Sequence, residues 1–180
     1  MHGCKVCGFD RGALRMMRET TSSSMFDWVK QRGVTWDVCA TLHVPISIRA
    51  AERGWSAEWL SKQLGRYFNK LDRRVLKSAH RNHDARLSRW VTLETCDGVG
   101  WHAHVALQTP SGMDQASFIT LVEKTWRQQY QRHTNKKFLE RLCLVEPILG
   151  EFFYYSIKSV HHADDLSKGI LDLENIHLPN

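Results

Sequence analysis

Two histidines one residue apart, His102 and His104, stand in a short apolar run over residues 101–107. The run predicts a β-strand, in which successive side chains point to opposite faces of the sheet. His102 and His104 then project from one face, while Ala103 and Val105 line the other. Two imidazoles held this close on a rigid strand are the beginning of a metal site, because neutral imidazole is a common ligand of divalent metals.

A third ligand is predicted on the strand that precedes the histidines. Residues 87–95 have the composition of a strand, and the Asp-Gly pair that follows them is a hairpin turn signal. If the two strands pair about Gly98, Glu94 lies directly opposite His102 and shares its face with His104. Opposed residues of a hairpin have Cβ atoms roughly 4.5–5.5 Å apart. The sequence therefore predicts a metal site formed by Glu94, His102 and His104, with Mn²⁺ or Mg²⁺ as the ion.

The other elements must position these ligands. Strands are predicted over residues 36–44 and 138–145, helices over residues 56–77 and 113–132, and a third helix after Gly150. The first six elements form a βαββαβ unit, which predicts an α+β protein with an antiparallel central sheet in the ferredoxin-like (split βαβ) arrangement. The histidine strand would then lie in the middle of the sheet. The last helix, which carries Tyr155 and Lys158, would lie over it.

These residues give the chain a resemblance to the HUH endonucleases. The family's His-hydrophobic-His signature is matched by His102-Ala103-His104, and its Tyr-x-x-Lys motif by Tyr155-Ser156-Ile157-Lys158. The segment CATLHV, residues 39–44, stands where replication-initiator members carry their first motif. The resemblance covers about residues 36–160 and is to the one-tyrosine rolling-circle replication initiators (Rep type).

The resemblance implies an activity and partners. It implies a metal-dependent endonuclease and strand transferase that nicks and rejoins single-stranded DNA to initiate rolling-circle replication of a plasmid or phage. Tyr155 would attack the scissile phosphate and leave a 5′-phosphotyrosine link, with Lys158 or the metal favouring the phenolate. The DNA would be a single strand or hairpin at a replication origin. Because the sequence has no GxxxxGK[ST] loop, unwinding is expected to come from a partner such as a host helicase or polymerase, or from a missing C-terminal region.

Charge and cysteine content narrow the setting. The formal net charge of +6 favours a polyanionic partner. The five cysteines are odd in number and scattered, which argues against a disulfide framework and predicts a reducing, cytoplasmic location. No apolar run approaches the roughly 18 residues that a membrane-spanning helix needs, so no membrane partner is expected.

Three segments are predicted along the chain: an N-terminal basic leader with a CxxC segment over residues 1–33, the HUH endonuclease domain over residues 34–162, and an acidic C-terminal tail over residues 163–180. Cys4 and Cys7 have the spacing of half a zinc knuckle, but no second CxxC completes it. A flexible leader is therefore the favoured interpretation. The tail is expected to pack against the domain, to lead to a partner, or to lead to a domain absent from this chain.

The predicted helix over residues 56–77 has a basic outer face with almost no interleaved acids. Its basic residues are Lys62, Arg66, Lys70, Arg73, Arg74 and Lys77, and the following loop adds His80, Arg81, His83 and Arg86. Such a run is either a solvated face or a surface that contacts phosphates. His80 and His83 are predicted to be surface residues. His43 can approach the histidine pair, with packing or hydrogen bonding favoured over metal binding.

Two other functions stay open at this point. One is a one-tyrosine HUH transposase, although those enzymes usually carry glutamine in place of the lysine and are shorter between the histidine strand and the tyrosine helix. The other, from a different class, is a ferredoxin-like nucleic-acid-binding module with a non-catalytic zinc.

Overall fold

The computed structural model of the 180-residue chain describes residues 27, 29, 31–51, 56–96, 100–148 and 169–178. The CxxC segment at Cys4 and Cys7, the predicted helix after Gly150, and with it Tyr155 and Lys158, lie outside the described residues. The described elements are, in chain order, β1 (Val38–Leu42), α2 (Ile46–Ala51), α3 (Ala57–Leu76), α4 (Ser78–His83), β2 (Arg89–Cys96), β3 (Gly100–Leu107), α5 (Gln115–Tyr130), α6 (Lys136–Leu139), β4 (Cys143–Pro147) and β5 (Gly169–Leu171).

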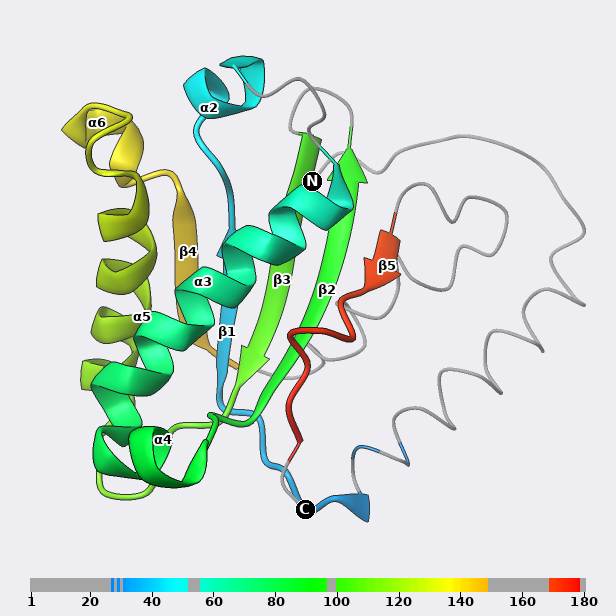
Figure 1. The fold of residues 1–180 in the computed structure, drawn as a ribbon, viewed down its shortest axis with the longest axis vertical. Coiled ribbons are helices and arrows are strands. Elements are labelled where there is room, and N and C mark those ends of the chain that lie inside the picture. Colours follow the sequence, from blue (N-terminus) through cyan, green and yellow to red (C-terminus); the bar gives the residue numbers. More distant parts are fainter. Residues whose placement is uncertain are drawn as a thin grey trace, which may run out of the picture.

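The protein is of the α+β class and is built on a five-stranded antiparallel sheet with the strand order β4-β1-β3-β2-β5. Helices α3 and α5 lie across one face of this sheet (Figure 1). The arrangement is compatible with a ferredoxin-like kind of fold. The predicted class and antiparallel sheet are confirmed, and the histidine strand β3 lies mid-sheet beside β1, as expected. None of the helices in the described part of the chain is long and apolar enough to cross a membrane.

Alternation along the strands separates the two faces of the sheet. In β1, Val38, Ala40 and Leu42 are at most 1% exposed and belong to the main core, which they share with buried side chains of α3 and α5. Cys39 and Thr41 alternate with them and therefore point to the opposite face. On that second face a smaller apolar cluster is built from residues of different strands, among them Trp90, Ala106 and Leu171.

Helix α3 confirms the prediction for residues 56–77 nearly to the residue. Its N-cap is Ser56, whose hydroxyl accepts a hydrogen bond from the backbone N–H of Trp59 at 3.2 Å. Buried side chains recur along the helix at three- and four-residue spacing, as an amphipathic helix requires. They include Leu60, Leu64, Tyr67, Phe68 and Leu71.

Two local predictions are wrong. The strand predicted over residues 138–145 begins only at Cys143, because Lys136–Leu139 form the short helix α6. The Asn135 side chain accepts a hydrogen bond from the backbone N–H of Phe138 at 3.2 Å and so caps this helical turn. The alternation before Cys143 was misleading, since Phe138 is 51% exposed. Residues 78–83, predicted as loop, form helix α4.

Residues 169–178, which belong to the predicted acidic tail, pack against the sheet and α3. Strand β5 pairs with β2 and places Gly169 opposite Glu94. The Asp172 carboxylate is buried and accepts hydrogen bonds from the Ser61 hydroxyl of α3 at 2.8 Å and from the Asn175 side chain at 2.7 Å. Of the outcomes expected for the tail, packing against the domain is the one that these residues show.

Candidate metal centre

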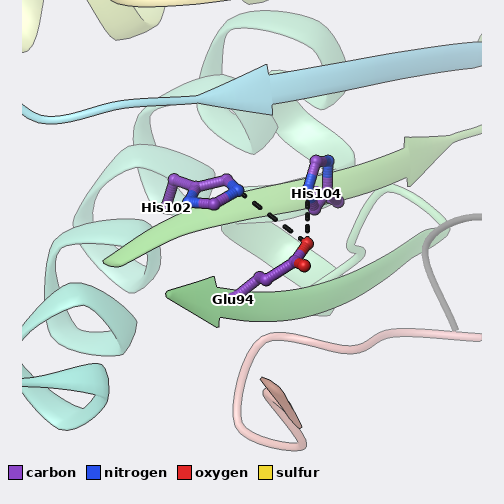
Figure 2. A group of neighbouring side chains, drawn as sticks. All are labelled: Glu94, His102 and His104. Carbon is purple, nitrogen blue, oxygen red and sulfur yellow. Dashed lines mark hydrogen bonds and ion pairs between the residues drawn. The ribbon is translucent and has the colours of Figure 1, made fainter. Parts of the chain in front are cut away.

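The β2–β3 hairpin brings Glu94, His102 and His104 together, as Figure 2 shows, on the face of the sheet opposite to the core that α3 and α5 cover. The register pairs Glu94 with His102 and Thr92 with His104, so the predicted alignment of the hairpin is confirmed. Glu94 and His102 face each other across the ladder, and His104 follows His102 on the same side because side chains repeat every two residues.

The three side chains converge on one point. Oε2 of Glu94 lies 3.0 Å from Nε2 of His104 and 3.9 Å from Nε2 of His102. One ligand atom from each residue can be chosen so that all three lie within 4.8 Å of one another. Two ligands bound at about 2.1 Å to the same ion are about 3–4 Å apart. The spacing of the donor atoms therefore fits a single divalent ion.

Hydrogen bonds on the far side of each ring orient the imidazoles. Nδ1 of His102 lies 3.1 Å from the backbone carbonyl oxygen of Gly100. Because a carbonyl oxygen only accepts, Nδ1 carries the proton and the neutral ring presents the lone pair of Nε2 to the site. Nδ1 of His104 lies 3.2 Å from the hydroxyl oxygen of Thr41 on β1. Such contacts fix the ring orientation and the tautomer of metal-binding histidines.

Burial differs between the nitrogen and oxygen ligands. The residues His102 and His104 are 6% and 5% exposed, and their neighbour Thr92 is fully buried. The side chain of Glu94 is 28% exposed. Two imidazoles are thus held in a shielded environment, while the carboxylate borders solvent and leaves an approach for a substrate or for water ligands.

His43 is the fourth side chain at this site. Its ring stacks on the His102 ring with a centroid separation of 5.2 Å and an interplanar angle of 24°. It does not belong to the ligand group found among the described residues. The packing role favoured from the sequence is thus what the ring geometry shows. The β1–β3 register explains the contact, since Leu42, the last residue of β1, pairs with Ala103 and the residue that follows it therefore falls beside His102.

Sequence reasoning missed Thr41. Its position is set by the pairing of β1 with β3, in which Thr41 lies directly opposite His104. The available signal was the alternation of residues 36–44, which places Thr41 and His43 on one face. The relative register of two strands about 60 residues apart in the sequence was not predicted.

The donor set itself limits the chemistry. Two imidazole nitrogens and one carboxylate oxygen suit Mn²⁺, Zn²⁺ or Fe²⁺ better than a site made only of oxygens, and they leave coordination positions open for water or substrate.

No protein-family model, curated protein or solved structure matches the chain.

Proposed function

We propose that this protein is a metal-dependent, single-strand DNA nicking and joining enzyme of the one-tyrosine HUH type, which initiates rolling-circle replication through Tyr155. The observation that carries the proposal is the cluster of Glu94, His102 and His104, with both imidazoles oriented by hydrogen bonds on their outer nitrogens. The proposal includes the finer fold, a split βαβ unit whose last helix brings Tyr155 and Lys158 over β3.

The proposed reaction uses the residues in separate roles. The phenolate oxygen of Tyr155 forms a bond to phosphorus, and the bond between phosphorus and the 3′-oxygen breaks. The 3′-oxygen leaves with its electron pair and takes up a proton, which balances the proton lost by the phenol. A divalent ion held by the three ligands would polarise the phosphodiester and neutralise its developing charge. A phenol has an unperturbed pKa of about 10, and the cationic Lys158 would lower it.

The positive charge of the protein favours DNA over the other substrates that a metal site with these residues could act on. Two histidines and a carboxylate also hold iron in enzymes that activate oxygen. The net charge of +6 and the exposed basic residues of α3 favour a polyanion instead. The proposed partner is accordingly single-stranded DNA at a replication origin, with a host helicase or polymerase acting beside it.

Covalent capture tests the proposal. The full chain is incubated with single-stranded oligonucleotides of randomised sequence and Mn²⁺, and protein–DNA adducts that survive denaturing electrophoresis are collected and sequenced. We expect an adduct from the wild type and from the matched control Tyr154→Phe, and none from Tyr155→Phe or after chelation of the metal. Sequencing of the trapped DNA would also reveal the preferred cleavage site.

Each alternative gives a different result in this assay. An adduct that persists in Tyr155→Phe removes this residue as the nucleophile. A wild-type chain that binds single-stranded DNA and one Zn²⁺ but never forms an adduct is a nucleic-acid-binding module. A transposase would form the same adduct, but the trapped sequences would come from transposon ends when genomic DNA replaces the random library.

A further inference from the structure

A row of four exposed cationic side chains, Arg66, Lys70, Arg73 and Lys77, runs along the outer side of α3 and its C-cap. We call these four residues the basic row. At 3.6 residues per turn, the four positions fall within about 60° of one another, and they span about 16 Å of helix axis. The buried stripe of α3, which includes Leu64, is about 160° away around the helix. The row therefore faces outward from the helical layer.

Among the described residues, the basic row has no acidic partner of the kind that its neighbours have. Lys62 pairs with Glu58, and Arg86 pairs with Asp84. Arg74 is turned toward α5, where it donates to the Thr125 hydroxyl and to the side-chain amide oxygen of Gln128, both at 2.7 Å. Within the part of the chain that the structure describes, no ion pair or side-chain hydrogen bond involves the four side chains of the row. Nothing in this part of the chain neutralises the four charges.

The backbone at Lys77 is a second, independent observation. Lys77 forms the junction between α3 and α4 with φ 47° and ψ −111°. This is a conformation that glycine adopts readily and that a side chain makes costly. A lysine at this position therefore costs stability, and strained positions of this kind are found where a side chain has a task. The strained backbone would be retained because the positive charge of Lys77 is useful at the end of the row.

The basic row and the metal centre lie on opposite sides of the sheet. Leu93 and Ala103 point into the core shared with α3, whereas their neighbours Glu94 and His102 point to the other face. Figure 1 shows α3 crossing in front of the sheet, and Figure 2 shows the metal ligands in front of the strands with helical ribbon behind the sheet. A DNA segment on the row is thus not the segment at the metal centre.

We propose that the basic row binds the phosphate backbone of duplex DNA, on the side of the sheet opposite the metal centre. A duplex carries one charge per 1.7 Å of axis, so a straight row of fixed cations releases more condensed counterions from it than from a single strand. The choice of DNA as the polyanion rests on the proposed function. The protein would then hold the duplex that flanks an origin while the single strand is cut on the other face.

Fluorescence anisotropy with a labelled duplex of arbitrary sequence, in EDTA, tests this surface in the full chain. The double variant Lys70→Gln, Arg73→Gln is compared with the control Arg132→Gln, Arg141→Gln, which has the same charge change on two other exposed residues. We expect the slope of log K against log salt to fall by about 1.8 in the row variant, because each lost phosphate contact removes about 0.9. If the variant and the wild type bind equally well in 1 M salt, each lost contact makes the variant bind roughly 8-fold more weakly than the wild type in 0.1 M salt. The control keeps the wild-type slope.

Lys77→Gly separates charge from folding. We expect this variant to have an unchanged or higher Tm, because glycine relieves the backbone strain, and yet to bind the duplex with a slope lower by about 0.9. Equal losses in the row variant and the control, or a single strand bound with the same affinity and slope as the duplex, would overturn the proposal. Neither the metal nor Tyr155 takes part in this assay, so its failure and a failure of adduct formation are distinguishable.

Discussion

Replacing Thr41 with valine should weaken metal binding although Thr41 is not a ligand. Its hydroxyl lies 3.2 Å from Nδ1 of His104, and Nε2 of the same ring faces Glu94. Valine has nearly the same shape but cannot hydrogen-bond to the ring, which is then less firmly held in the orientation that directs Nε2 at the ion. The fold should tolerate the change, because valine is well suited to a strand.

The expected size of this effect follows from outer partners of metal-binding histidines in general. Removing such a partner typically lowers metal affinity by about 10–100-fold, which corresponds to about 1.4–2.8 kcal/mol. The sheet supplies a matched control, since Thr41 and Thr92 are both directly opposite His104, on the two strands that flank β3. The Thr92 hydroxyl donates to the backbone carbonyl oxygen of His104 at 3.5 Å, not to its ring. Thr92→Val should therefore bind the ion nearly as tightly as the wild type.

Mn²⁺ titration followed by the electron paramagnetic resonance of the free ion gives the two dissociation constants directly. Thermal unfolding without metal shows whether each variant is folded as well as the wild type. If Thr41→Val and Thr92→Val lose affinity equally, or neither loses any, the argument that Thr41 orients His104 toward an ion is refuted. If the wild type itself binds no divalent ion, the metal centre is refuted with it.

The remaining predictions concern the buried charges. Arg89→Met should lower the free energy of unfolding in urea by about 3–5 kcal/mol, because it leaves the fully buried Asp72 carboxylate without the guanidinium that donates to both its oxygens at 3.0 Å. Adding Asp72→Asn should restore part of the loss. Burial raises the pKa of the Asp172 carboxyl in the folded protein, so the folded state is more stable when this carboxyl is protonated than when it is ionised. Wild type should therefore lose stability relative to Asp172→Asn as the pH rises from about 4 to neutral, and a change of the opposite sign would contradict this.

The metal ligands could be predicted from the sequence because the interactions that set their geometry are local. Glu94 and His102 belong to one hairpin, and a turn signal together with the two-residue repeat of a strand is enough to fix which residues face each other. The helix over residues 56–77 was equally local, with a capping serine and a regular apolar stripe. In both cases all the information lies within about 20 residues of chain.

The features that were missed depend on distant parts of the chain. Asp172 and Ser61, 111 residues apart, form a buried hydrogen bond that helps attach the C-terminal segment to α3. No local pattern in an acidic, leucine-bearing stretch indicates that partner. The error at residues 138–145 has a local origin. The sequence there alternates as in a strand, but Asn135 caps a short helix, and the first part of the predicted strand is helical.

The metal centre combines both kinds of information. Its ligands come from a single hairpin, but β1 supplies Thr41 beside His104, and the residue after β1, His43, supplies the ring stacked on His102. An isolated hairpin would keep the contact between His102 and the Gly100 carbonyl, but it would lose the Thr41 contact that orients His104 and the His43 ring that packs on His102. Because rotamer freedom lost on binding opposes binding, a ring already held in place by β1 binds an ion more tightly than a free one. The pairing of β1 with β3 is therefore what turns three suitably spaced residues into a preorganised site, and Thr41→Val measures that contribution separately from the ligands themselves.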